Sequence, residues 1–140
     1  MTEEILLGKI KGTIIPDAQK NGEFDPSDFY STEHHLHAEL KCMTKHSGRV
    51  MIERKKYDEL FNLPNNPKLR YIVSTPNGAW SFDLRSRKIR EIPDDWWRQV
   101  FIKNASTYYH RNINETYKLC AFLPLGWAKN ITDEIGYFEN

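Results

Sequence analysis

The 140-residue chain contains few cysteines and no long apolar segment. Its two cysteines, Cys42 and Cys120, do not make a disulfide framework, so a reducing cytoplasm is the expected location. No apolar run approaches the roughly 18–20 residues that a membrane-spanning helix needs. The first four residues, MTEE, are acidic where a secretory signal is basic. We therefore expect a cytoplasmic protein with no membrane partner.

Apolar and aromatic residues are plentiful enough to form a core. They make up 39% of the chain and include 7 Phe, 7 Tyr and 4 Trp, so general disorder is excluded. The length suits one compact domain over residues 1–140.

Charge is balanced overall but uneven along the chain. The net charge is +1, from 20 basic and 19 acidic residues. Residues 1–40 have three lysines against eight acidic residues, whereas residues 41–118 have sixteen basic residues against eight acidic ones. A positive central segment of this kind indicates a surface for a polyanion such as nucleic acid.

The hydrophobic pattern predicts an α/β or α+β fold, a single domain with a mixed central β-sheet flanked by helices. Tyr57, Leu60 and Phe61 have the i, i+3, i+4 spacing of a helix over residues 53–62. A second helix is expected near residues 94–103, where Asp94 would cap it. Strands are expected at residues 5–15 (or a short helical turn leading into a strand), 34–43, 69–75, 79–84, 88–92 and 116–123.

The strongest chemical signal is Asp28 followed by Glu39-Leu40-Lys41. Because side chains on a strand alternate between its faces, Glu39 and Lys41 would project from the same face. A hairpin over the intervening residues would bring Asp28 beside Glu39. Two converging carboxylates repel each other, and Mg²⁺ relieves that repulsion while leaving coordination positions for water and phosphate oxygens. These groups are the parts needed for metal-assisted hydrolysis of a phosphodiester.

This arrangement resembles the core of the PD-(D/E)xK nuclease superfamily, which includes restriction endonucleases and Holliday-junction resolvases. The resemblance depends on Asp28, the Glu39–Lys41 triplet, a short strand after it, the helix with Tyr57 and Leu60 inward, and the strand at 69–75. It covers residues 20–84 as a nuclease-like core, with 85–140 as an appended aromatic and basic segment.

The resemblance implies a restriction-endonuclease-like fold and a role for each matching residue. Asp28 and Glu39 would bind Mg²⁺, which Mn²⁺ could replace, and the backbone carbonyl of Leu40 would complete the coordination. Lys41 would be catalytic. Pro16-Asp17 is a literal Pro-Asp, so Asp17 is the alternative first ligand. The family usually has an amphipathic helix with an acidic residue before the aspartate, and only residues 1–7 could supply it, with Glu4.

Basic residues after the triplet are expected to bind the substrate, most readily DNA, through its phosphates. A nuclease this small that cuts both strands would act as a homodimer. His37, on the same strand face as Glu39, is a candidate for a phosphate contact or an accessory base. The candidate nucleic-acid-binding residues are Lys45, Arg49, Lys55, Lys56, Arg85, Arg87 and Arg90.

Two other interpretations stay open. One is a nucleic-acid- or protein-binding factor without catalysis, of a viral or host-defence type, whose binding would depend on Arg85, Arg87 and Arg90. The other is a histidine-based metalloprotein, since His35 and His37 share the predicted strand face of Glu39 and could form a 2-His-1-carboxylate set. His34 and His46 lie close in sequence, and His110 could approach in space.

Overall fold

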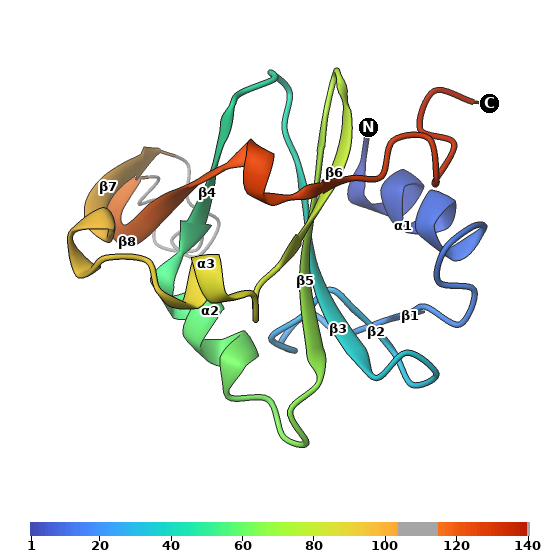
Figure 1. Ribbon diagram of the computed structural model, residues 1–140, viewed down its shortest axis with the longest axis horizontal. Helices are drawn as coiled ribbons and strands as arrows, with labels where there is room; N and C mark the ends of the chain where they lie inside the picture. The colour runs from blue at the N-terminus through green and yellow to red at the C-terminus, as the bar shows by residue number, and fades with distance from the viewer. Residues whose placement is uncertain (104–114, 140) are drawn as a thin grey trace.

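Two β-sheets make up the centre of the protein (Figure 1). The computed structural model describes residues 1–103 and 115–139. Within these residues the fold is mixed α/β, as the sequence predicted, and no described helix has the length and apolar character to cross a membrane.

The larger sheet has six strands in the described part of the chain, in the order β1-β2-β3-β5-β6-β9. The central strands β3 and β5 are parallel, whereas all other neighbours are antiparallel. The parallel register places Glu39 beside Tyr71 and Lys41 beside Val73. The strands are β1 Gln19–Lys20, β2 Phe29–Ser31, β3 Leu36–Cys42, β5 Lys68–Thr75, β6 Gly78–Asp83 and β9 Lys129–Asn130.

The second sheet is antiparallel, with β8 (Glu115–Pro124) between β4 (Arg49–Glu53) and β7 (Arg98–Lys103). Because β4 comes from the first half of the sequence and β8 from the second, the sequence segments 20–84 and 85–140 share one sheet. They are therefore parts of a single domain.

Three α-helices and two 3-10 helices accompany the described strands. Thr2 caps the first helix by accepting a hydrogen bond from the Ile5 amide at 3.2 Å, and Leu6 and Ile10 form its buried face. The second helix follows β4 directly and buries Leu60. The helices are α1 Glu3–Lys11, α2 Arg54–Phe61, α3 Arg87–Arg90, η1 Asp94–Trp96 and η3 Leu125–Trp127.

The larger sheet is buried on both faces. On one face, Tyr71 and Val73 of β5 pack against α2 and the second sheet. On the other face, Ala38 and Leu40 of β3 pack against α1. The alternation of β3 therefore directs Leu40 toward α1 and leaves Glu39 and Lys41 on the opposite face, as the sequence predicted.

Three predicted elements differ from the structure, the first of them only in part. For residues 5–15 the alternative of a helical turn is correct, since residues 5–11 belong to α1, but no strand follows within this segment. Leu6 and Ile10 have helical spacing behind a capping threonine. Residues 88–92 form most of α3, which contributes a single buried side chain, Ile89. Residues 94–103 begin as a 3-10 turn and continue as β7, because pairing with β8 and a run of aromatic and β-branched residues favour a strand.

Candidate active site

The candidate site forms at an open edge of β3. On this edge β2 pairs with β3 only as far as Ala38, and in the described residues no strand pairs with Glu39–Cys42 there. Asp28, directly before β2, binds the next residues of β3 by two hydrogen bonds. Its amide donates to the Ala38 carbonyl at 2.9 Å, and its side-chain Oδ2 accepts from the Leu40 amide at 2.7 Å. The Asp28 carboxylate is thereby fixed beside the Glu-x-Lys triplet.

The Leu40 carbonyl points to the same open edge. In a strand, the N–H and C=O of one residue point to the same side, and the Leu40 N–H already points toward Asp28. This edge therefore presents a carboxylate and a backbone carbonyl together, and Leu40 lines the cavity described next.

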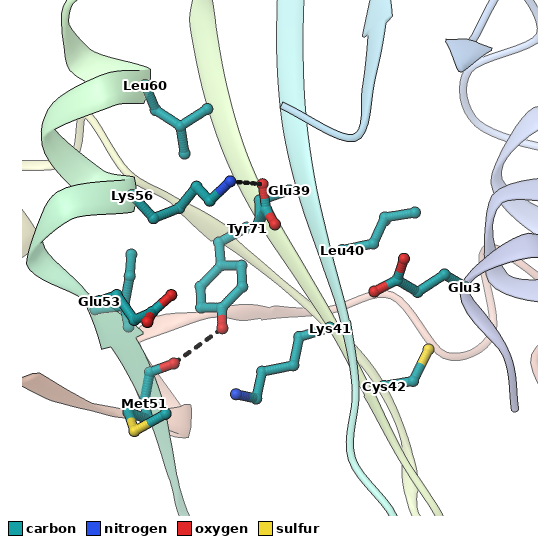
Figure 2. A pocket seen from close by; sticks show the side chains of 11 residues that line it. Glu3, Glu39, Leu40, Lys41, Cys42, Met51, Glu53, Lys56, Leu60 and Tyr71 are labelled. Carbon is teal, nitrogen blue, oxygen red and sulfur yellow. Dashed lines mark hydrogen bonds and ion pairs between the residues drawn. The ribbon is translucent and has the colours of Figure 1, made fainter. Parts of the chain in front are cut away.

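A cavity of about 470 Å³ opens beside this edge (Figure 2). Its walls come from five elements, of which only β4 and α2 are consecutive in the sequence: α1, β3, β4, α2 and β5. The lining residues are Glu3, Glu39, Leu40, Lys41, Cys42, Met51, Ile52, Glu53, Lys56, Leu60 and Tyr71.

Glu39 is the most perturbed acid in this cavity. Its side chain is only 17% exposed, and burial together with the nearby Asp28 carboxylate raises the pKa of Glu39 to about 8. The Lys56 ammonium opposes this shift from 3.6 Å, a distance too long for a hydrogen bond. The buried Oε2 of Glu39 has no hydrogen-bond partner in residues 1–103 and 115–139. Such an oxygen is costly to keep in a fold unless something else binds it.

Glu3 adds a third acid at the edge of the cavity. It lies in the first turn of α1, and burial and the Asp28 carboxylate raise its pKa. The acidic residue that α1 brings to the site is therefore Glu3, not the expected Glu4. Glu4 is directed to solvent, where its carboxylate lies 3.8 Å from the Lys20 ammonium.

Two lysines face the acids from opposite walls. Lys41 extends into the cavity from β3, and its ammonium makes no hydrogen bond or ion pair with the described residues. Lys56 extends from α2 and donates to the Pro26 carbonyl at 3.2 Å. Tyr71 lies between the two lysines (Figure 2), and its hydroxyl donates a hydrogen bond to the Met51 carbonyl at 2.9 Å. This bond joins β5 to β4 within the cavity lining.

His37 lies on the same strand but outside the cavity lining. Its Nδ1 is 2.8 Å from the Ser27 hydroxyl, and its ring stacks on Tyr30 with centroids 5.9 Å apart. Burial is the main cause that lowers the pKa of His37. The contacts with Ser27 and Tyr30 thus hold the His37 ring beside the turn before Asp28.

Asp17 belongs to a different cluster. It accepts from the Ser31 hydroxyl at 2.5 Å and from the Glu33 amide at 2.9 Å. In the described part of the chain, the group of three metal-ligating side chains whose ligand atoms lie within 4.8 Å of one another is Asp17, Glu33 and His34. The geometry therefore places Asp28, and not Asp17, beside the Glu-x-Lys triplet.

The other histidines are dispersed. His35 precedes β3 with a φ of 50°, so the expected alternation with His37 is broken, and its ring contacts the Asn65 carbonyl at 2.8 Å. His46 contacts the Thr75 hydroxyl at 2.9 Å. His110 lies outside the described residues. The set of His35, His37 and Glu39 is not brought together as a group of ligands within the described chain.

The predicted nucleic-acid-binding residues lie in four kinds of environment. Lys56 is in the cavity, and Arg87 is exposed and paired with Glu91 at 2.9 Å. Arg85 is half-buried and donates to the Pro67 carbonyl at 2.6 Å, with its guanidinium 4.7 Å above the Phe61 ring. The remaining residues are exposed: Lys45, Arg49, Lys55 and Arg90.

Arg85 therefore stabilises the fold, and its removal should show this. We expect Arg85→Ala to lower the free energy of unfolding by about 1–3 kcal/mol, because the Pro67 carbonyl and the Phe61 ring lose their partner. Urea unfolding measures the change. The neighbouring Arg87→Ala is the matched control, since its partner is an exposed Glu91; equal losses in the two variants would contradict the structural role of Arg85.

Three residues that line the cavity are not among those predicted from the sequence. Tyr71 reaches Glu39 through the parallel pairing of β3 and β5, which no local pattern encodes. Glu53 lines the opposite wall and forms a 2.6 Å ion pair with Lys118 of β8. Glu3 was detectable, because it shares the i, i+3, i+7 spacing of Leu6 and Ile10 on α1.

In comparisons with known proteins, the chain matches no family model and no curated sequence.

Proposed function

We propose that the protein is a Mg²⁺-dependent nuclease that hydrolyses phosphodiester bonds of DNA. The observation that carries this proposal is the convergence of the Asp28 and Glu39 carboxylates at the open edge of β3, where a buried oxygen of Glu39 has no hydrogen-bond partner among the described residues. A buried carboxyl group with a strongly raised pKa and an unpaired oxygen destabilises the fold, and such groups are typical of functional sites.

The residues fit a magnesium ion. Asp28, Glu39 and the Leu40 carbonyl offer oxygen ligands, which Mg²⁺ prefers, and the cavity has room for water and phosphate oxygens beside them. When bound, Mg²⁺ would lower the pKa of a coordinated water and offset the negative charge of the phosphate. Mn²⁺ would take the same ligands.

The chain's own groups have distinct tasks in this proposal. The Leu40 amide holds Asp28 in place, and the burial of Glu39 keeps its carboxyl at the cavity edge. Lys41, without a partner among the described residues, is available to contact the phosphate or to orient the attacking water. Lys56 partly compensates the charge of Glu39 from the opposite wall.

The order of elements supports the same proposal. A helix with an acidic residue, a strand preceded by the aspartate, the Glu-x-Lys strand, a short strand, a helix and a strand parallel to β3 occur in the order α1, β2, β3, β4, α2 and β5, with the two-residue β1 between α1 and β2. This order is the one expected from the resemblance to the PD-(D/E)xK core. Cys42 and Cys120 are both free thiols, which suits a cytoplasmic location.

A nucleic-acid-binding protein without catalysis is the second candidate. One observation favours it: Asp28 already accepts a hydrogen bond from Leu40, and Glu39 already lies near Lys56, so both acids have a role in the fold. In that case the exposed bases would bind DNA, and the cavity would be inert.

Plasmid nicking decides between the two candidates. We expect the wild-type protein to nick supercoiled plasmid in Mg²⁺ or Mn²⁺ and to be inactive in EDTA, with linear product if two subunits each cut one strand. Asp28→Asn keeps an oxygen acceptor for the Leu40 amide but loses the charge, so it should fold and lose cleavage. Asp17→Asn is the matched control and should cleave normally. Binding without cleavage by the folded wild type on plasmid, linear and branched DNA would contradict the nuclease.

A further inference from the structure

The strands β4, β8 and β7 form the three-stranded sheet (Figure 1). A second groove, of about 680 Å³, lies on the outer face of this sheet. It is separate from the Glu39 cavity and has no assigned role. Its lining residues are Arg49, Trp96, Arg98, Gln99, Val100, Phe122 and Pro124.

Strand alternation explains why these side chains gather there. On β8, Ala121 and Leu123 are buried in the core, so Phe122 between them points to the outer face. Register then sets its neighbours, because Pro124 of β8 lies opposite Arg49 of β4. On the other side of β8, Arg98 lies opposite Cys120 and two residues from Val100 on β7.

The groove begins one strand away from the candidate active site. Met51 lines the Glu39 cavity and is directly opposite Phe122 in the antiparallel register. Side chains in such a pair lie on the same face with their Cβ atoms about 4.5–5.5 Å apart. An extended ligand that leaves the cavity past Met51 therefore reaches Phe122 first and then Arg49 and Arg98.

The groove combines aromatic rings with positive charge. Phe122 is 43% exposed, a large fraction for a phenylalanine in a central strand. Trp96 is half-buried and held by stacking on Trp127, with ring centroids 5.5 Å apart and planes at 15°. Arg49 and Arg98 are exposed, and none of the described lining residues is acidic. The lining thus suits a ligand with both negative charge and flat apolar faces.

We propose that this groove binds a single-stranded segment of nucleic acid, with phosphates on Arg49 and Arg98 and an unpaired base on Phe122. This inference rests on the proposed nuclease function and deepens it. If the bond is cleaved in the Glu39 cavity, the substrate has unpaired nucleotides beside that bond. Stacking on aromatic rings next to cations is how proteins bind single strands. In a duplex, each base is covered by its neighbours and offers no free face to Phe122.

Binding in EDTA tests the groove independently of cleavage. We expect fluorescence anisotropy to show tighter binding of a labelled dT oligonucleotide than of a blunt duplex of equal length. Phe122→Ala should weaken binding of the oligonucleotide roughly tenfold and leave the duplex nearly unchanged, whereas Phe122→Trp should retain the affinity. Arg98→Ala should reduce the salt dependence of binding by about one phosphate contact.

Matched variants separate the groove from general effects. Phe24 is 96% exposed elsewhere on the molecule, so Phe24→Ala should leave oligonucleotide binding unchanged, as should Lys11→Ala on α1. The inference is overturned if folded Phe122→Ala binds the oligonucleotide as wild type does, or loses duplex binding equally. Single-strand binding that depends on Phe122 in a protein that cleaves nothing would support the groove and count against the nuclease only.

Discussion

Lys41→Ala should lower the rate of DNA cleavage by at least about 100-fold, the usual scale for losing a group that assists proton transfer or charge stabilisation. The Lys41 ammonium lies in the cavity without a hydrogen bond or ion pair to the described residues, so its removal breaks no contact seen in the fold. Single-turnover cleavage of a plasmid in Mg²⁺ measures the effect, and urea unfolding checks that stability is retained.

Two further variants make the Lys41 result specific. Lys11→Ala removes an equal charge from the exposed end of α1 and should cleave at the wild-type rate. Lys41→Arg keeps the charge but cannot accept a proton, so partial activity would assign charge stabilisation and complete loss would assign proton transfer. Full activity of folded Lys41→Ala would remove Lys41 from the mechanism.

Local sequence patterns are enough to predict individual strands and helices of this fold. The alternation of β3 is encoded in residues 36–42 alone, and the structure places Glu39 and Lys41 on one face as that pattern requires. The helix α2 was equally legible from the spacing of Tyr57, Leu60 and Phe61. These elements depend on nearest neighbours in the chain, so the sequence determines them directly.

The rest of the site depends on pairing between distant segments. The spacing of Trp96, Val100 and Phe101 is compatible with a helix, but the contact of β7 with β8 gives a strand. Tyr71 meets Glu39 only because β3 and β5 are parallel neighbours, and Glu53 is held by Lys118 from the far end of the chain. No window of the sequence contains both members of such a pair.

Glu39→Gln should abolish cleavage and, at the same time, stabilise the metal-free protein at alkaline pH. The pKa of Glu39 is about 8 in the fold against an ordinary value of 4.5, so the folded protein keeps a proton that the unfolded chain releases between these values. Stability of the wild type therefore falls as the pH rises from about 4.5 to about 8. Glutamine has the same size as glutamate and no carboxyl proton to lose, so the free energy of unfolding of the variant does not show this decrease with pH.

Urea unfolding in EDTA at several pH values measures the difference. We expect the advantage of Glu39→Gln to be small at pH 5 and to reach roughly 2–4 kcal/mol at pH 9, since each pKa unit corresponds to about 1.4 kcal/mol. Glu4→Gln, at an exposed acid on α1, is the control and should show no such growth. Added Mg²⁺ should stabilise the wild type at pH 8 more than Glu39→Gln, because the variant loses one of the two negatively charged ligands. A variant that is less stable than wild type at pH 9 would mean that Glu39 serves the fold through Lys56 rather than a metal.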